Sequence, residues 1–451
     1  MNSKIKIFTK RLSAAQLIVF YYLVAVMVST ILLLLPITQK GNTELAFIDA
    51  VFISISAVTV TGLSTVDVSQ LLSVPGTFIF AIILQFGGIG VMAFGTILWL
   101  LSGKRIGLRA RILMTTEQNS PTFSGIVRLI RMIFYVFVIV ELFGAVVFGT
   151  YFLKYFSTWQ EAYLQGFFAS VAATTNAGFD ITGKSLIPFA DDYFVILINI
   201  VLFIIGSLGF PVLIELIQWF RHKRRSTFQF SLFTKVTTAT FFILIVIGVV
   251  FIYLFEYSHF FANKNWHQSF FHSLFYSISS RTGGMAISDV NELSVPTILL
   301  LCIFMFIGAS PSSAGGGIRT TTFAVMLLTI YNYSKGNRTI KIFKREIEEE
   351  DIIKSFIVFT TGMILCIMAV FILAYFETAF SLMEILFEVS SAFGTVGLSL
   401  GITPDLSIIG KSVIMILMFI GKIGMFTFLF FMGGKPMKQP FHYPKERIII
   451  G

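Results

Sequence analysis

Four short stretches of the chain carry residue types that could bind a cation through backbone oxygen atoms. They read "TVTGL" (59–63), "TNAGF" (175–179), "RTGGM" (281–285) and "GTVGL" (394–398), and none contains a carboxylate. Glycine adopts positive φ without steric cost, and this can turn successive carbonyl oxygens towards one axis. A ring of such dipoles can replace the water shell of a monovalent cation, whereas the absence of acidic side chains disfavours a filter for divalent ions.

The candidate ion-binding set takes four residues from each stretch, ending at the glycine. The set is Thr59, Val60, Thr61 and Gly62; Thr175, Asn176, Ala177 and Gly178; Arg281, Thr282, Gly283 and Gly284; and Gly394, Thr395, Val396 and Gly397. A simpler interpretation is that the stretches are tight turns outside the membrane. Such turns would not require the short apolar segment that precedes each stretch here.

The four glycines recur in register with the hydropathy of the chain, which indicates a tandem repeat. Gly62, Gly178, Gly284 and Gly397 lie 116, 106 and 113 residues apart. A second glycine follows each of them after 24 to 28 residues, and in three units it opens "GGIG", "GSLG" or "GKIG". The second glycines are Gly87, Gly206, Gly308 and Gly421. Four matches in register are a strong signal of internal repetition.

The composition places these repeats in a membrane. Of the 451 residues, 56% are hydrophobic and 12% are charged, whereas a soluble domain has about 25% charged residues. The first apolar segment, 15–37, is too long for the apolar core of a signal peptide and is predicted to be the first span. Cys302 and Cys366 lie in apolar spans, so no disulfide framework is implied.

Most of the lysines and arginines, 25 of 33, fall in five clusters, and their distribution predicts the topology. The clusters lie at residues 4–11, 104–131, 221–235, 335–354 and 435–447. By the positive-inside rule all five clusters face the cytoplasm. The chain is therefore predicted to be a multi-pass protein of the plasma membrane with both termini in the cytoplasm. The formal charge of +10 could also mark a nucleic-acid binder. Because topology already accounts for the positive charge, no nucleic-acid partner is expected. The expected partner of the apolar surface is the lipid bilayer.

Between consecutive clusters the chain must cross the membrane and return, so four excursions are predicted. Each has two apolar runs that can cross a core of about 30 Å, with a shorter segment between them that suits a re-entrant helix. The predicted fold is an all-α membrane protein of eight transmembrane helices and four pore helices around a pseudo-fourfold axis. Its parts are a cytoplasmic N-terminus (1–14), repeats 1 to 4 (15–102, 126–220, 233–331 and 351–433) and a cytoplasmic C-terminal tail (434–451).

The second span of repeat 3 is interrupted by helix-breaking residues. It contains "FIGASPSSAGGGIRTTTF" (306–323). In a helix interior, glycine costs about 1 kcal/mol and proline about 3 kcal/mol relative to alanine. This segment is therefore predicted to unwind. Lys422 lies at the matching point of repeat 4, where its charge should face the pore or a polar loop.

Other charged residues lie close to the four stretches. A buried charge is normally paired, so Glu388, in the fourth short helix, is the candidate partner of Arg281, and a structural brace is favoured over ion binding. No role is assigned to Glu141, within the span 126–153. Four aspartates after the glycines could form an acidic outer vestibule or be ordinary loop carboxylates. They are Asp67, Asp180, Asp289 and Asp405.

The four units and their motifs resemble the Trk/Ktr/HKT superfamily of potassium transporters. The likeness covers residues 12–440 and is closest to the Ktr type, because the chain starts almost at its first span. The resemblance implies potassium uptake through one filter per chain, a homodimer, and a cytoplasmic ring of RCK-type nucleotide-binding regulatory subunits. It implies K⁺ as the permeating ion, no covalent cofactor, and a nucleotide bound by the ring rather than by this chain.

The resemblance also implies an intramembrane gating loop at the interrupted span. The matching residues are Gly308, Ser310, Pro311, Ser312, Ser313, Gly315, Gly316 and Gly317, with Lys422 where relatives often have Arg. The third stretch departs from the family, because Gly283 and Met285 stand where Ala and Phe are common. This departure predicts looser packing behind the filter. It leaves open a sodium-permeable or poorly selective cation transporter of the same superfamily.

A membrane enzyme and an alternating-access transporter are the alternatives from other classes. An enzyme would need a nucleophile, a metal cluster or an acid–base pair in a pocket. His267 and His272 have no acidic third ligand nearby, and the chain has no P-loop or dinucleotide-binding fingerprint. A transporter built from inverted repeats would have units of alternating orientation, whereas these four share one. The chain is therefore not expected to be an enzyme.

Overall fold

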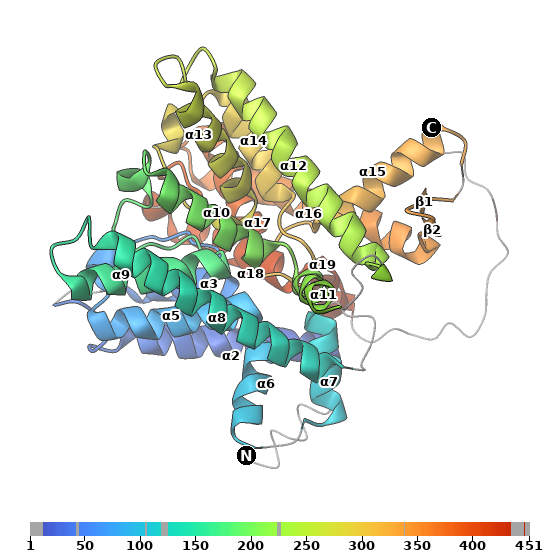
Figure 1. Ribbon diagram of the computed structural model, residues 1–451, viewed down its shortest axis with the longest axis horizontal. Helices are drawn as coiled ribbons and strands as arrows, with labels where there is room; N and C mark the ends of the chain where they lie inside the picture. Colours follow the sequence, from blue (N-terminus) through green and yellow to red (C-terminus); the bar gives the residue numbers. More distant parts are fainter. Residues whose placement is uncertain are drawn as a thin grey trace.

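The computed structural model describes residues 12–41, 45–103, 106–118, 125–222, 227–337, 339–433 and 446, and it consists almost entirely of α-helices (Figure 1). One strand pair occurs in this part of the chain, an antiparallel hairpin of β1 (Lys341–Ile342) and β2 (Arg345–Glu346). The basic N-terminal cluster and, apart from residue 446, the C-terminal tail lie outside the described residues.

The helices form four consecutive units, each with a long helix, a pore helix and a second apolar helix. The long helices are α2 (Ala14–Leu34), α8 (Ile126–Phe152), α12 (Leu232–Glu256) and α16 (Glu349–Phe376). The pore helices are α3 (Phe47–Thr59), α9 (Trp159–Thr175), α13 (Trp266–Ile278) and α17 (Leu382–Gly394). The second helices are α5 (Val74–Ile89), α10 (Tyr193–Ser207), α14 (Val295–Phe306) and α18 (Ile408–Ile423). The predicted order of elements is confirmed.

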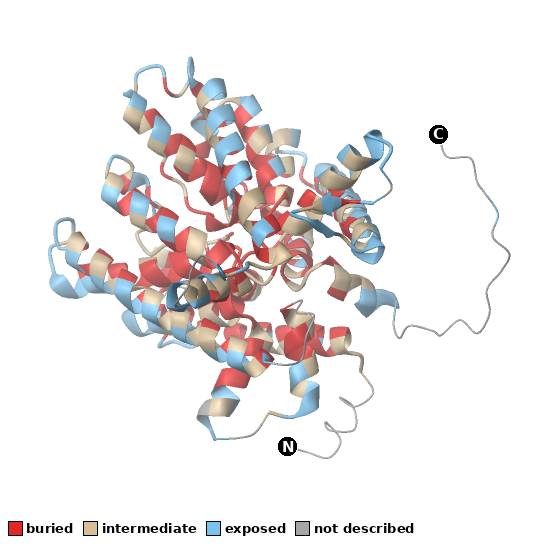
Figure 2. Ribbon diagram, turned by 45° about the vertical axis from the view of Figure 1, so that its right-hand side comes forward, coloured by how far each residue is buried: buried red, intermediate tan, exposed pale blue. Residues whose placement is uncertain are grey.

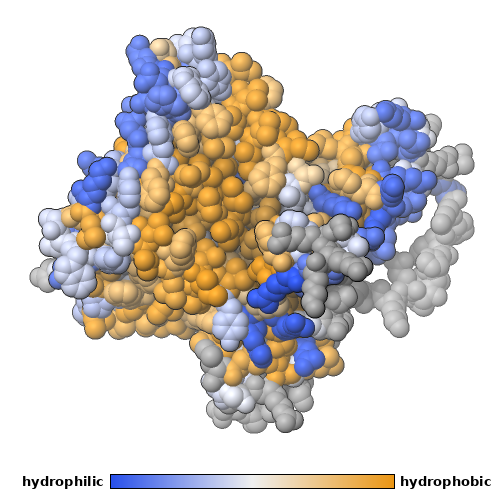
Figure 3. All heavy atoms as spheres, in the orientation of Figure 1, coloured by the Kyte–Doolittle hydropathy of each residue, from blue (hydrophilic) through white to orange (hydrophobic). Residues whose placement is uncertain are grey.

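The long helices are apolar enough to cross a membrane, and less than half of each is buried inside the protein. The remaining apolar surface forms a broad hydrophobic face between hydrophilic regions at opposite ends of the molecule (Figure 3). Exposing apolar surface to water costs about 25 cal/mol per Å². A face of this extent therefore belongs in lipid, and the chain is a multi-pass membrane protein.

Three of the second apolar runs differ from the expected continuous helix. α5, α10 and α18 are each followed, after a short break, by a further helix that turns away by 109°, 104° and 103°. These further helices are α6 (Val91–Leu101), α11 (Phe210–Arg221) and α19 (Met425–Gly433). Gly90, Gly209 and Gly424 stand at the breaks with φ between 84° and 101°, a conformation that L side chains rarely adopt. The last glycine of "GGIG", "GSLG" and "GKIG" therefore makes a corner instead of extending the span.

The third unit has a longer interruption, as the sequence predicted. α14 ends at Phe306 and α15 (Thr320–Ser334) begins at Thr320, so residues 307–319 are non-helical. We call this segment the gate loop, after the role that the family resemblance implies for it. A further helix, α7 (Leu108–Glu117), connects the first unit to the second.

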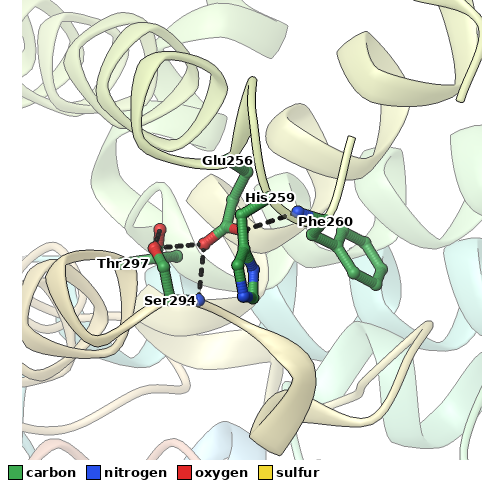
Figure 4. Close-up of polar contacts among 5 residues, drawn as sticks. All are labelled: Glu256, His259, Phe260, Ser294 and Thr297. Atoms are coloured by element: carbon green, nitrogen blue, oxygen red, sulfur yellow. Dashed lines mark hydrogen bonds and ion pairs between the residues drawn. The ribbon is translucent and has the colours of Figure 1, made fainter. Parts of the chain in front are cut away.

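A polar contact ties the far end of each long helix to the start of the following second helix. In the third unit, Glu256 Oε1 accepts from the backbone N and the Oγ of Ser294, at 2.8 and 2.7 Å (Figure 4). Glu256 Oε2 also accepts from the backbone N of Phe260 at 3.3 Å. The equivalent contacts are Glu377 with Ser407, Tyr151 with Asp192, and Ser73 with the carbonyl of Ile37. These contacts fix the return angle of the chain in every unit.

The four units close into a ring. The second helix of each unit packs against the pore helix of the next, which pairs α5 with α9, α10 with α13, α14 with α17, and α18 with α3. The last pair joins the fourth unit to the first and contains an ion pair between Lys411 and Asp49, with Nζ 2.9 Å from Oδ1. Buried residues concentrate towards the middle of the ring (Figure 2). The predicted pseudo-fourfold arrangement is thus present.

Candidate functional site

The four pore helices end at the four glycine-containing stretches. Val60, Asn176 and Thr395 cap α3, α9 and α17 in the left-handed region, with φ between 50° and 58°. α13 continues into a π-helical turn, η3 (Ser279–Gly283), which Gly284 caps with φ of 69°. The candidate ion-binding residues therefore all lie at C-terminal helix ends. The partial negative charge of such an end favours a cation.

The glycines of neighbouring stretches are in contact. A Cβ atom on Gly62 would lie 2.8 Å from the Cα of Gly178, and one on Gly178 would lie 3.3 Å from the Cα of Gly284. A Cβ on Gly284 would collide with the carbonyl oxygen of Val396, and one on Gly397 would lie 3.0 Å from the Cα of Gly62. The contacts run through units 1, 2, 3 and 4 and back to unit 1, so the stretches form a closed ring.

A cavity of about 290 Å³ adjoins this ring and is lined by all four of its glycines. Asp180 also lines the cavity. Asp180 accepts from the backbone N of Thr182 and Gly183, just as Asp67 and Asp289 accept from the backbone N of Ser69 and Asn291. Of these three aspartates, Asp180 lines the cavity.

The third stretch follows a different backbone path from the others. In the other three stretches, the N–H of the residue before the glycine donates to the carbonyl five residues earlier. In the third, Gly284 itself makes this bond, to the carbonyl of Ser279 at 3.1 Å, so the π-helical turn shifts the pattern by one residue. The predicted looser packing is not observed. A Cβ on Gly283 would lie 2.8 Å from the ring of Phe203, and Met285 is buried.

The gate loop packs against the third and fourth stretches. A Cβ on Gly315 would lie 2.5 Å from Cγ2 of Thr282, and one on Gly316 would lie 2.5 Å from Oγ1 of Thr395. Backbone hydrogen bonds attach the loop to the second helices of units 2 and 4. The bonds are Ser310 N to Ser207 O (3.2 Å), Ala314 N to Gly206 O (3.0 Å) and Gly317 N to Gly421 O (3.3 Å). The loop thus crosses between two units of the ring.

Two cationic side chains donate to carbonyl oxygens of the gate loop. The buried Lys422 donates through Nζ to the carbonyl of Ala314, as expected for a lysine that faces a polar loop. Arg319 donates through Nη1 to the carbonyls of Ser310, at 3.4 Å, and Gly315. The sequence analysis missed Arg319, although a charged residue two positions after three consecutive glycines in an apolar run was the available signal.

The connecting helix α7 also reaches the gate loop. The carbonyl of Gln118, the residue after α7, accepts from Oγ of Ser312. The carboxylate of Glu117 accepts from two backbone N–H groups at the start of α6, at 3.1 Å each. A cavity of about 40 Å³ lies among these groups, and Arg319 and Lys422 also line it. Sequence patterns could not show this contact, because its partners lie far apart in the chain.

The predicted ion pair between Arg281 and Glu388 is not formed. Glu388 accepts instead from the hydroxyls of Ser399, at 2.9 Å, and Thr403. Arg281 donates to two backbone carbonyls. The two side chains have different surroundings, because Arg281 lies against α12 and the gate loop, whereas the hydroxyl partners of Glu388 line the 290 Å³ cavity.

Glu141, to which the sequence assigned no role, joins units 1 and 2. Gln85 Nε2 donates to both of its carboxylate oxygens, at 2.6 Å each, and Glu141 is 7% exposed. Gln85 stands two residues before Gly87 on α5, and a Cβ on Gly87 would lie 2.6 Å from the carbonyl oxygen of Val58 in the first pore helix. This pair therefore supports the helix that packs behind the first stretch.

The fold and the ring define a class: a multi-pass membrane protein in which four pore-helix repeats surround one axis. The chain belongs to the TrkH family, described as cation transport protein, which matches residues 3–440. The resemblance inferred from the four motifs is confirmed. The chain is accordingly a transport protein and not an enzyme.

Two relatives and one solved structure illustrate this membership. The chain is 52% identical over 440 residues to the Ktr system potassium uptake protein D of Bacillus subtilis (strain 168), covering 98% of both chains. It is 32% identical over 443 residues to the Ktr system potassium uptake protein B of the same organism, covering 98% of this chain and 97% of the relative. Its fold matches the crystal structure of the potassium transporter TrkH from Vibrio parahaemolyticus with a TM-score of 0.72 at 19% identity, covering 91% of this chain and 82% of that chain.

Proposed function

We propose that this chain is the ion-translocating subunit of a potassium-uptake system in the cell membrane. The observation that carries the proposal is the closed ring of Gly62, Gly178, Gly284 and Gly397 at the ends of four pore helices. Backbone carbonyls at negative helix ends suit a dehydrated monovalent cation. The names of the two Ktr system potassium uptake proteins support K⁺ as that ion.

In this proposal the four residues that end at each glycine form the filter, and the gate loop with Lys422 closes the path on the side away from the 290 Å³ cavity. The contacts of Gly315 and Gly316 with the third and fourth stretches support this division of roles. By the positive-inside rule, the basic connections between units place the gate loop towards the cytoplasm, with both termini on that side.

Ion flux in liposomes tests the proposal. The full-length protein should carry K⁺ at least about tenfold faster than Na⁺, a ratio that corresponds to 1.4 kcal/mol of discrimination. The rates are measured under opposed K⁺ and Na⁺ gradients, with protein-free liposomes as the control. Equal rates would support the less selective transporter that the shifted third stretch favours. If neither ion moves faster than in the control liposomes, the proposed function is wrong.

We also propose a homodimer that carries a cytoplasmic ring of RCK-type subunits, with the nucleotide bound by that ring. The name "Ktr system", shared by the two relatives, supports a second component. The hydrophilic surface for docking is the basic connections, including "RHKRR" (221–225) and residues 335–345, together with the tail.

Purification tests this partner. A nucleotide-binding regulator should co-purify with the full chain, and truncation after Lys435 should reduce its recovery, because the tail contributes basic docking surface. Recovery is compared at equal amounts of membrane subunit. Equal recovery of the regulator with the truncated chain would show that the tail does not contribute to docking, and only the basic connections between units would remain as the proposed docking surface.

A further inference from the structure

Arg281 is a fully buried cation without an acidic partner among the described residues. Its side chain is 1% exposed, and its guanidinium carbon lies 4.3 Å from the centre of the Phe241 ring. Nη1 donates to the carbonyl of Phe241 at 3.1 Å, and Nη2 donates to the carbonyl of Gly308 at 3.4 Å. A buried charge is costly unless it is hydrogen-bonded, so these two carbonyls and the ring fix the position of the guanidinium.

The two carbonyls that accept from Arg281 belong to different parts of the protein, a long helix and the gate loop. Phe241 lies within α12, a 25-residue helix that forms the wall of the third unit. Gly308 is the second residue of the gate loop, just after the end of α14. Gly308 lies beyond the helical hydrogen bonds of α14, so Arg281 donates to a carbonyl at the start of the gate loop. We call this point, at Gly308, the hinge of the loop.

The hinge keeps its position only while the gate loop is in place. The backbone N of Ala309 donates to the carbonyl of Gly316 at 3.2 Å, and a Cβ on Gly308 would collide with that same carbonyl oxygen. The two ends of the loop are therefore packed on each other next to the acceptor of Arg281. Withdrawal of the loop would release Gly308 and with it one of the two bonds of the guanidinium.

The backbone of Arg281 belongs to the third stretch. It lies in η3, one residue before Thr282, and Thr282 packs against Gly315 of the gate loop. The third stretch is also the one whose hydrogen bonds are shifted by one residue relative to the other three. The single side chain of Arg281 thus connects an irregular part of the ring to the hinge of the loop.

We propose that Arg281 is a positioning residue that couples the gate loop to the third stretch of the filter. With the loop in place, Arg281 holds the third stretch between α12 and Gly308. When the loop withdraws, Arg281 loses its hydrogen bond to Gly308, and the ring discriminates less well between K⁺ and Na⁺. The inference rests on the proposed function, because it assumes that the ring selects the ion. A plain structural brace would need only the acceptor on α12.

A double-mutant cycle in liposomes tests the coupling. Arg281→Lys keeps the charge, but one ammonium cannot reproduce the forked donor geometry of a guanidinium. The K⁺/Na⁺ flux ratio should fall about tenfold in Arg281→Lys and about threefold when residues 312–317 are deleted, which are effects within the usual range for coupled neighbours. In the double variant the ratio should match that of Arg281→Lys, because the hinge contact is already lost. Phe241→Leu removes the ring and keeps the carbonyl, so it should lower the ratio less than Arg281→Lys does, because both hydrogen bonds of the guanidinium remain.

The outcomes for the variants test the coupling through Arg281, whereas the flux ratio of the unmodified protein tests the proposed function. Multiplied effects in the double variant would make Arg281 a brace unconnected to the loop, and an unchanged ratio in Arg281→Lys would also reject the coupling. If Arg281→Lys does not insert or fold, Arg281→Gln takes its place in the cycle, because a side-chain amide also lacks the forked donors of a guanidinium. Failure of the unmodified protein to prefer K⁺ would instead count against the proposed function.

Discussion

Replacing Gly397 with Ser should lower the K⁺/Na⁺ flux ratio by about tenfold, a loss of roughly 1.4 kcal/mol of discrimination. Gly397 has φ of 102°, which L side chains rarely adopt, and a Cβ there would collide with the carbonyl oxygen of Thr61 in the first stretch. The side chain would therefore displace a carbonyl that the proposed filter uses. Flux of both ions in liposomes, measured on protein that inserts normally, gives the ratio.

Gly401 provides the matched control for this substitution. It lies four residues after Gly397 and has φ of 95°, but a Cβ on it would meet no atom within 4 Å. Gly401→Ser therefore imposes similar backbone strain without crowding the ring, and its flux ratio should stay that of the unmodified protein. Equal losses in both variants would attribute the effect to backbone strain, and an unchanged ratio in Gly397→Ser would argue against the filter.

The sequence predicted those features that repeat in every unit. The spacing of Gly62, Gly178, Gly284 and Gly397 against the apolar runs was enough to place one pore helix before each glycine, and the ring contacts follow from that arrangement. The triple glycine after Pro311 was enough to predict the interrupted helix, because the cost of these residues in a helix is local. Local causes can be recognised in a linear sequence.

Features that depend on φ or on distant partners could not be predicted in the same way. A run such as 76–101 is mostly apolar and carries no charge, so hydropathy indicates one span, and only the φ of Gly90 shows the corner. Arg281 was paired with Glu388 because opposite charges are the simplest partners. Backbone carbonyls such as that of Gly308 are invisible in a sequence, since every residue has one. The contact of Gln118 with Ser312 likewise joins residues 194 positions apart.

Opening of the gate is the second large effect that we expect. Lys422→Ala removes the hydrogen bond from Nζ to the carbonyl of Ala314. A hydrogen bond to a charged group contributes about 1.5–3 kcal/mol, so a closed–open equilibrium should shift about tenfold or more towards the open state. K⁺ flux should rise and depend less on the regulatory subunits. Deletion of residues 312–317 should raise flux further, because it also removes the loop atoms that contact the ring.

Arg319 explains why the deletion should have the larger effect. Its guanidinium still donates to the carbonyls of Ser310 and Gly315 after Lys422 is lost, so the alanine variant keeps the hydrogen bonds that hold the loop in its own conformation. Lys422→Arg should preserve gating, since it keeps the charge and adds donors. Ser412→Ala removes a hydroxyl of the same helix that donates only within that helix, to the carbonyl of Ile408, and should leave flux unchanged. If the deletion and Lys422→Ala both insert folded and conduct like the unmodified protein, with and without the regulator, residues 307–319 are a passive interruption and the gate must be formed by another part of the chain.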